Sequence, residues 1–442
     1  MKLAIIGGAG VRVPLLVRGL VHSDLGITDV ALFDTDPQRL RLIADLATRA
    51  VDGVPVSFHD NPSACIDGAD FVITSIRVGG SEQRARDEAT AIAHGVVGQE
   101  TVGPAGCAMA IRAIPAMVEY ARLTARLSPN AWLVSFTNPV SIVTQAMRQE
   151  SSDRVIGICD TPFEICEDAA HALGLPAREC SYDYFGLNHL GWLREIYYKG
   201  APQMHRLWAD AGALQAAYRD PLFEVERLQQ LRLLPTEYLY YYYRPEVALD
   251  HMRRAGTSRG IVVAQLTEAL FEDLAKAPRD PMARYEQYLA ARDGSYMQVE
   301  TGSRTPRVKP AWAELSGYDR IALMTMRGIV HNTREVIPLD VTNRGNFPFL
   351  RDDDVVEVPC LVDANGPRAL HVAPVPDHCA ELITRVKAYE RATVAAALSG
   401  SRSDRMRAFQ MSPLTVAADR LPALTDALIP DGRGVRLQPD QQ

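Results

Sequence analysis

The first 160 residues alternate between short apolar runs and segments with helical spacing, and this alternation constrains the fold most strongly. The apolar run KLAIIGGAG (2–10) precedes helical spacing through residues 11–22, and similar runs recur as DVALFDTD (29–36) and DFVITSIRVGG (70–80). The connections are too long for hairpins, so successive strands have to run parallel with helices packed on the sheet. The sequence therefore predicts an α/β fold with an N-terminal Rossmann-like, doubly wound parallel sheet of the dehydrogenase type.

A glycine-rich stretch follows the first predicted strand. Gly7, Gly8 and Gly10 stand where strand turns into helix, the position at which a backbone approaches a pyrophosphate. The third glycine of the usual pattern is replaced by Val13, so a tight structural turn stays an alternative. Asp34 ends the second strand and is typical of a carboxylate that binds the ribose hydroxyls of NAD, although it could instead cap the next helix. Together these residues predict an NAD site.

The character of the sequence changes near residue 170. Residues 200–300 are helical and rich in aromatic residues, and residues 318–360 mix a helix with strand-like pieces. We therefore expect an NAD-binding Rossmann-like domain over residues 1–170. A C-terminal α+β domain over residues 171–442 would carry substrate and metal contacts and the oligomer interface, in a homodimer or homotetramer.

Composition limits the possible partners and locations. The 442 residues are 47% apolar and 23% charged with a net charge of −7, which argues against a nucleic-acid-binding protein. No run of 18 apolar residues and no signal-peptide pattern is present, so no membrane partner is expected. Seven cysteines at irregular spacing fit a reducing compartment. We expect a cytoplasmic protein that binds a small molecule.

Two residues far apart raise the question of a shared site. Cys159 closes a predicted strand at the sheet edge where such folds bind ligands, and His189 follows a second apolar run. Spacing alone does not join them, because a lone buried cysteine is usually a small apolar residue and a lone histidine usually has core partners.

Longer motifs around these residues are more specific. The chain resembles the NAD- and divalent-metal-dependent glycosidases of glycoside hydrolase family four. The similarity lies in IIGGAGVRVPLLVRGL (5–20), RVGGSEQRARDE (77–88), GVVGQETVGPAG (95–106), SFTNPVSIV (135–143), GICDTP (157–162) and YFGLNHLGW (184–192). A weaker similarity continues through PTEYLYYYY (235–243) and SGYDR (316–320).

The resemblance implies specific roles. Cys159 and His189 match the family's metal ligands, usually for manganese. Asp160 matches the acid that assists the leaving group, and Tyr318 matches the base. The residues that match positions lining the sugar and the nicotinamide are Arg84, Glu100, Asn138 and Asn188.

The resemblance also implies a reaction. NAD would take a hydride from C3 of the sugar, the base would remove the C2 proton, and the aglycone would leave before the hydride returns. The divalent metal would stabilise the enediolate as a Lewis acid. The substrate expected is a 6-phosphorylated β-glucoside, because the longer motifs look more like the β members. Asp160 is instead associated with α members, so a 6-phospho-α-glucosidase or an unphosphorylated substrate stays open.

Two other classes compete with this interpretation. A 2-hydroxy-acid dehydrogenase would share the N-terminal fold but leaves Cys159 and the GQET and NHLGW motifs unexplained. An NAD-sensing regulator without activity would have no need of metal ligands and a base.

Overall fold

Six parallel strands form the N-terminal half of the central sheet, in the order β3-β2-β1-β4-β5-β6. This is the order of a Rossmann fold, so the predicted fold class is confirmed. The computed structural model describes residues 1–21, 23–51, 53–218, 222–302 and 317–430. The strands are β1 (Lys2–Ile6), β2 (Asp29–Phe33), β3 (Val56–His59), β4 (Phe71–Thr74), β5 (Trp132–Ser135) and β6 (Val155–Gly157).

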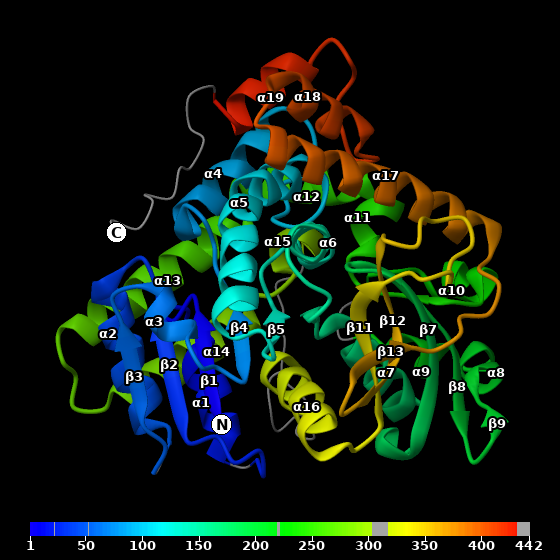
Figure 1. Cartoon of the computed structure of the whole chain (residues 1–442). Helices are drawn as coiled ribbons and strands as arrows, with labels where there is room; N and C mark the ends of the chain where they lie inside the picture. The colour runs from blue at the N-terminus through cyan, green and yellow to red at the C-terminus, as the bar shows by residue number, and fades with distance from the viewer. Residues whose placement is uncertain (22, 52, 219–221, 303–316, 431–442) are drawn as a thin grey trace.

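Apart from the edge strand β3, whose residues are half-buried or exposed, these strands are mostly buried and apolar, as expected for a parallel sheet covered on both faces. The helices between and after them are α1 (Val13–Val21), α2 (Pro37–Arg49), α3 (Pro62–Ile66), α4 (Gly80–Ala93), α5 (Gly103–Leu127), α6 (Val140–Glu150) and α7 (Thr161–Ala172). Figure 1 shows most of this half in blue and cyan.

The sheet continues without a break into the second half through antiparallel strands. β6 pairs with β11, β11 with β12, β12 with β7, and β7 with β8, so one 13-stranded sheet links the described halves. The bounds are β7 (Cys180–Leu187), β8 (Leu190–Tyr198), β9 (Ala201–Pro202), β10 (Leu234–Pro235), β11 (Glu335–Thr342), β12 (Val355–Asp363) and β13 (Gly366–Ala369). Two of these joints rest on one residue pair each, Asp340–Gly157 and Glu357–Gly186.

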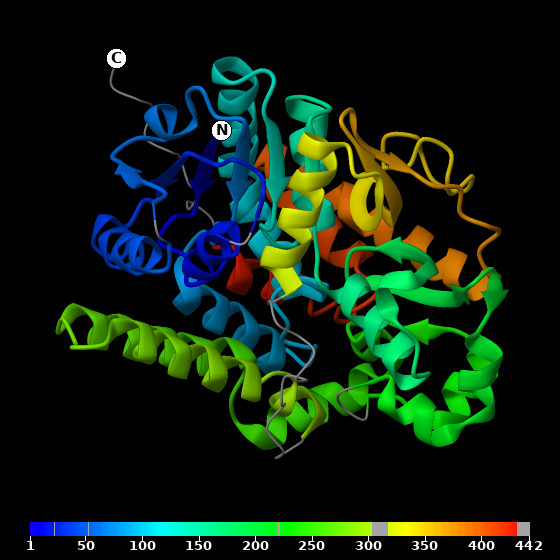
Figure 2. The same ribbon diagram turned by 90° about the horizontal axis from the view of Figure 1, so that it is seen from below.

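Helices of the second half pack on strands of that half and against helices of the first half. The shorter ones are η1 (Ala177–Glu179), α8 (Met204–Ala209), α9 (Ala211–Ala216), α10 (Val225–Leu231), α11 (Leu239–Tyr243), α12 (Pro245–Ala255), α15 (Gln298–Thr301), α18 (Arg402–Met411) and α19 (Leu421–Leu428). The longer ones are α13 (Arg259–Ala275), α14 (Pro281–Gly294), α16 (Gly317–His331) and α17 (Asp377–Ser399). In Figure 2, α13 and α14 form a green hairpin alongside the blue N-terminal half.

Within the part of the chain that the structure describes, no helix combines the length and apolar character needed to cross a membrane. The sequence predicts a surface segment at TGSRTPRVKPAW (301–312) and a frayed end at DGRGVRLQPDQQ (431–442). All but two of these residues lie outside the described residues.

Candidate active site

The glycine turn after β1 lies directly against neighbouring strands. The backbone N–H groups of Gly7 and Gly8 both donate to the carbonyl of Phe33, at 3.0 and 2.8 Å. Gly7 has φ +93°, and a Cβ there would stand 2.3 Å from the carbonyl oxygen of Ser75. A side chain is therefore excluded at Gly7 for both conformational and steric reasons.

Asp34 and Asp36 have separate tasks at the end of β2. Asp36 caps α2, since its side chain accepts hydrogen bonds from the backbone N–H groups of Gln38 and Arg39. Asp34 instead accepts from the backbone N–H of Ala9 in the glycine turn at 3.0 Å and lines the adjoining cavity. Asp36 rather than Asp34 therefore caps α2, and Asp34 stands where a ribose-binding carboxylate is expected.

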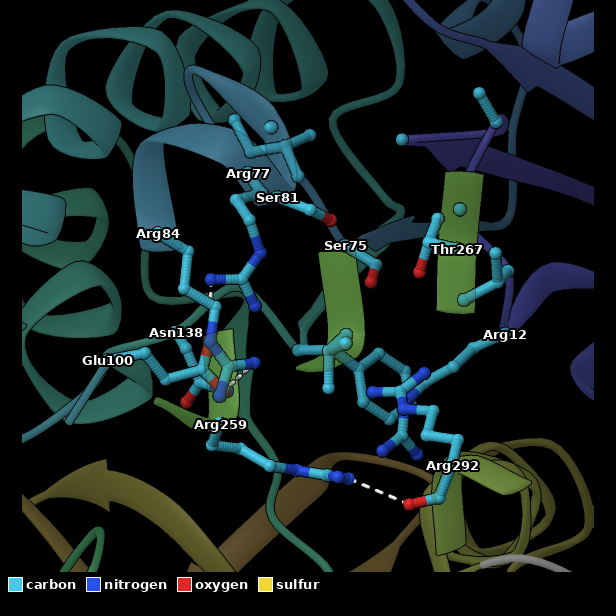
Figure 3. Close-up of a pocket in the computed structure, with 18 of the residues that line it drawn as sticks. Arg12, Ser75, Arg77, Ser81, Arg84, Glu100, Asn138, Arg259, Thr267 and Arg292 are labelled. Carbon is cyan, nitrogen blue, oxygen red and sulfur yellow. Dashed lines mark hydrogen bonds and ion pairs between the residues drawn. The ribbon is translucent and has the colours of Figure 1, made fainter. Parts of the chain in front are cut away.

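A cavity of about 710 Å³ extends from the glycine turn between the two halves of the chain. Its wall includes Gly7, Gly10 and Asp34 from the first half, and residues of α13 and α14 from the second. Figure 3 shows Arg12 and Arg292 extending into it, with Arg77, Arg84 and Glu100 gathered on the opposite side. A cavity of this size suits a cofactor and a small substrate.

Arg84 and Glu100, predicted to contact the substrate, pair with each other. Arg84 Nη1 lies 3.0 Å from Glu100 Oε1, its Nε bonds Glu88 at 2.8 Å, and Arg77 Nη1 lies 2.5 Å from Glu100 Oε2. Burial acts against the charged form of Glu100, but Arg77 and Arg84 outweigh it and lower its pKa to about 2. Glu100 is therefore a permanent anion in the cavity wall, bracketed by two guanidinium groups.

Asn138, for which the resemblance implies contact with the sugar and the nicotinamide, also lines the cavity, three residues after β5. Its Oδ1 is buried without a hydrogen-bond partner among the described residues. Because buried polar atoms are nearly always paired, an orphaned amide oxygen in a cavity wall fits the recognition of a bound molecule.

His189 occupies the tight turn between β7 and β8 with φ +60° and is 3% exposed. Burial lowers the pKa of His189 to about 3, so the imidazole is neutral, as a metal ligand must be. Its ring stacks on Tyr238, with centroids 3.7 Å apart and planes 6° apart.

The tautomer of His189 follows from its partners. Gln99 Oε1 accepts from two backbone N–H groups, those of Thr101 and Val102, so it is the amide oxygen and can only accept. The Thr101 hydroxyl donates to it at 2.7 Å and therefore accepts from His189 Nδ1 at 2.8 Å. Nε2 is left with its lone pair and has no hydrogen-bond partner among the described residues. Such outer partners orient metal-binding histidines.

Cys159 and Asp160 follow β6. Asp160 stands at the N-terminus of α7 without making a side-chain cap bond, and it lines the cavity. Burial, together with Glu164 and Glu237, raises the pKa of Asp160 well above the ordinary aspartate range. Burial, with Glu357 and Asp160 adding to it, also raises the pKa of the Cys159 thiol.

Asn188, for which the resemblance implies a position lining the sugar and the nicotinamide, is not among the residues that line the cavity. Its Nδ2 donates to Glu357 Oε1 at 3.2 Å, while Tyr184 OH donates to Glu357 Oε2 at 2.6 Å. Glu357 thus fixes the residue that precedes His189 and also acts electrostatically on Cys159. Cys159 and His189 have a second neighbour in common, since Tyr238 stacks on His189 and interacts electrostatically with Cys159.

Among the described residues, no cluster of three or more His, Cys, Asp and Glu side chains is suited to hold a metal. In the ligand set that the resemblance implies, Cys159 and His189 would provide two ligands and leave other positions open, as catalytic metals require. The neutral imidazole with its lone pair on Nε2 fits this role. A cation would also favour the thiolate that burial alone opposes.

Tyr318 belongs to α16, but its side chain lies outside the described residues. Among the described residues, five tyrosines line the cavity, and two of them, Tyr238 and Tyr296, lie close to each other. Tyr238 precedes α11, and its hydroxyl lies 3.5 Å from that of Tyr296, which donates to Glu237. Tyr238 lies in the PTEYLYYYY motif (235–243) that carries part of the resemblance, and this motif is the sequence feature that could have indicated a role for it.

The fold and this site together define a nucleotide-binding α/β enzyme in which a buried cysteine, Cys159, and a buried histidine, His189, share Tyr238 as a neighbour. The sequence matches the model of the family 4 glycosyl hydrolases over residues 2–175 and that of their C-terminal domain over residues 184–415. The chain belongs to the family 4 glycosyl hydrolases, which confirms the resemblance.

Relatives within the family differ in the anomer named. A probable 6-phospho-β-glucosidase of Bacillus subtilis is 29% identical, over 97% of this chain and 96% of the relative. The 6-phospho-β-glucosidase of Thermotoga maritima, solved with manganese, NAD⁺ and glucose-6-phosphate, is 27% identical with a TM-score of 0.80, covering 97% of both chains. A 6-phospho-α-glucosidase from gut microorganisms, solved with NAD and glucose-6-phosphate, is 26% identical with a TM-score of 0.80, again covering 97% of both.

Proposed function

We propose that this protein hydrolyses 6-phosphorylated β-glucosides with NAD and a divalent metal, by transient oxidation at C3 of the sugar. The single observation that carries the proposal is the His189 turn, whose hydrogen bonds prepare Nε2 for a metal next to a cavity that begins at the glycine turn. The NAD and manganese named for the solved relatives support it.

In this proposal the glycine turn and Asp34 bind the cofactor, and Asn138 contacts it or the sugar. Bound NAD supplies a hydride acceptor. Cys159 and His189 would hold the divalent metal, which supplies the positive charge that stabilises an anion formed at C2. Asp160, with its raised pKa, carries a proton that it can give to the leaving oxygen.

The phosphate preference has support of its own. Arg12, Arg259 and Arg292 line the cavity and give it positive charge suited to a phosphate dianion. The relatives solved with glucose-6-phosphate agree with this chemistry. The β preference rests on the longer motifs, such as residues 184–192. The cytoplasmic location and the homodimer or homotetramer stay predictions.

We propose Tyr238 as a second candidate for the base that removes the C2 proton, in addition to the predicted Tyr318. Tyr238 lines the cavity and its ring lies against His189. Burial, and then Glu237, raise the pKa of Tyr238, so its phenolate form depends on a nearby cation. The Cys159–His189 pair would hold that cation.

The first experiment measures turnover of nitrophenyl β- and α-glucoside 6-phosphates and their unphosphorylated forms. Protein stripped of cofactor and metal should be inactive, and adding both NAD⁺ and Mn²⁺ under reductant should restore β-6-phosphate turnover without net NADH. Full hydrolysis by the stripped protein would contradict the proposal. Stoichiometric NADH accumulation with a hydroxy acid would favour the dehydrogenase alternative, and faster α turnover would assign the other anomer.

A second experiment identifies the base. Tyr238→Phe, Tyr318→Phe and Tyr296→Phe each remove one hydroxyl and keep the ring. The variant that lacks the base should lose about 10²-fold or more in turnover. It should also stop deuterium from solvent entering C2 of the product. Wild-type exchange in Tyr238→Phe would reject Tyr238, and exchange lost only in Tyr318→Phe would establish that residue instead.

A further inference from the structure

At the end of the cavity next to Asp34, here called the ribose end, two residues favour different cofactors. Asp34 is the carboxylate expected for the ribose hydroxyls of NAD. Arg39, in the first turn of α2, lines the same cavity and is the type of residue that accommodates the 2′-phosphate of NADP in this fold. The cofactor preference thus depends on what else contacts Arg39.

Arg39 is held by a residue from the other half of the chain. Its Nη2 bonds both carboxylate oxygens of Glu268, in α13, at 2.7 and 2.8 Å. Its Nε lies 3.3 Å from Asp36 Oδ2, and its guanidinium lies 4.6 Å above the centroid of the Phe271 ring. Two carboxylates and a ring face therefore fix this guanidinium and offset its charge.

The position of helix α13 explains how Glu268 reaches the ribose end of the cavity. The α13–α14 hairpin runs alongside the N-terminal half, as Figure 2 shows. It is also attached near the glycine turn, where Tyr285 OH donates to the carbonyl of Val11 at 2.7 Å. Thr267 and Phe271, on either side of Glu268 along α13, line the cavity.

We propose that Glu268 determines cofactor specificity by occupying Arg39, so that the protein accepts NAD and rejects NADP. With Glu268 in place, a 2′-phosphate would be repelled by the carboxylates of Asp34, Asp36 and Glu268. The charge of Arg39 would not compensate, because these carboxylates already offset it. Without it, Arg39 can turn to the phosphate. This inference rests on the proposed use of NAD and names the residue that selects between the two dinucleotides.

The test is a direct binding titration of NAD⁺ and NADP⁺, which needs no catalysis. Glu268→Gln keeps the size of the side chain and removes its charge. Glu272→Gln is the matched control, because Glu272 lies one helical turn further along α13, is exposed and has no hydrogen bond or ion pair with Arg39. A double variant, Glu268→Gln with Arg39→Gln, tests whether Arg39 carries the effect. Thermal unfolding of each variant checks that it is folded.

We expect Glu268→Gln to bind NADP⁺ about tenfold more tightly, with NAD⁺ affinity changed by less than about twofold. The control and the double variant should bind NADP⁺ as weakly as the wild type. An equal gain in Glu272→Gln, a gain that survives in the double variant, or unchanged NADP⁺ affinity while NAD⁺ binds normally would overturn this inference alone. Failure of the wild type to bind NAD⁺ would overturn it together with the proposed function.

Discussion

The imidazole of His189 lies parallel to the phenol ring of Tyr238, with the ring centroids 3.7 Å apart. Tyr238 thus covers one face of the imidazole, and the Thr101 hydroxyl fixes its Nδ1 edge at 2.8 Å. The ring can therefore present only Nε2 to a ligand. Its orientation is set by the protein before any ligand arrives, which reduces the cost of ordering the site.

Removing the hydroxyl of Thr101 should weaken metal binding. In Thr101→Val, His189 Nδ1 loses its acceptor, and loss of such outer partners typically costs about 10- to 100-fold in metal affinity. Titration of Mn²⁺ followed by electron paramagnetic resonance measures the affinity directly. Thr101→Ser keeps the hydroxyl and should bind Mn²⁺ like the wild type. Equal affinities of the valine and serine variants would mean that the hydrogen bond does not orient the ligand.

Asp160→Asn should separate substrates by their leaving groups. An alkyl β-glucoside 6-phosphate needs a proton on its leaving oxygen, whereas nitrophenolate leaves readily without one. Turnover of the alkyl substrate should fall by about 10²-fold or more, and that of the nitrophenyl substrate far less. Paired steady-state rates check this. An equal loss on both would indicate that Asp160 supports the metal rather than donating a proton.

Acid should destabilise the protein partly through Glu100. Its pKa is about 2, below its ordinary value of 4.5, because Arg77 and Arg84 outweigh the effect of burial. The unfolded chain therefore takes up this proton more readily than the folded one, so the stabilisation is present above pH 4.5 and disappears as the pH falls toward 2.

Urea unfolding at several pH values tests this effect. Glu100→Gln should show a smaller loss of unfolding free energy than the wild type between pH 4.5 and 2. The same change at exposed Glu82 serves as control and should leave the wild-type slope. A wild-type slope in Glu100→Gln would contradict the assignment.

Gly191→Ala should disturb the support of the His189 turn. A Cβ at Gly191 would stand 1.8 Å from the Tyr184 hydroxyl, which is buried and bonded to Glu357. We expect a loss of about 1–3 kcal/mol in unfolding free energy, the usual scale for overpacking, and weaker Mn²⁺ binding. Gly212→Ala in α9, where a Cβ would meet only the flexible Asp210 carboxylate at 3.3 Å, should leave both nearly unchanged. Denaturant unfolding and Mn²⁺ titration measure the two effects.

Sequence patterns predicted those features of the fold that depend on residues close together in the chain. The strand ends with Gly7 and Asp34 follow from apolar runs broken by glycine or acid, and they lie as expected. The spacing of IPAMVEYARLTARLSP (114–129) predicts a helix there, but α5 begins earlier, at Gly103. Burial of most of this segment favours a continuous helix despite Pro115.

Contacts between distant segments could not be predicted in the same way. The pairing of Arg84 with Glu100 and the contact of Glu268 with Arg39 depend on side-chain directions and on which helix covers which strand. The resemblance supplied Cys159 and His189, but the role of Thr101 appeared only from the direction of its hydrogen bonds. Spacing along a chain does not encode these directions.

The joint between β6 and β11 has a consequence for folding. The boundary between the two matched regions, residues 175–184, is no boundary in the sheet, because β6 and β7 are connected through β11 and β12. Cutting the chain there would leave β6 and β11 as bare edges, which invite pairing with other molecules. The two halves should therefore unfold as one cooperative unit, and fragments made separately should aggregate or recombine rather than fold independently.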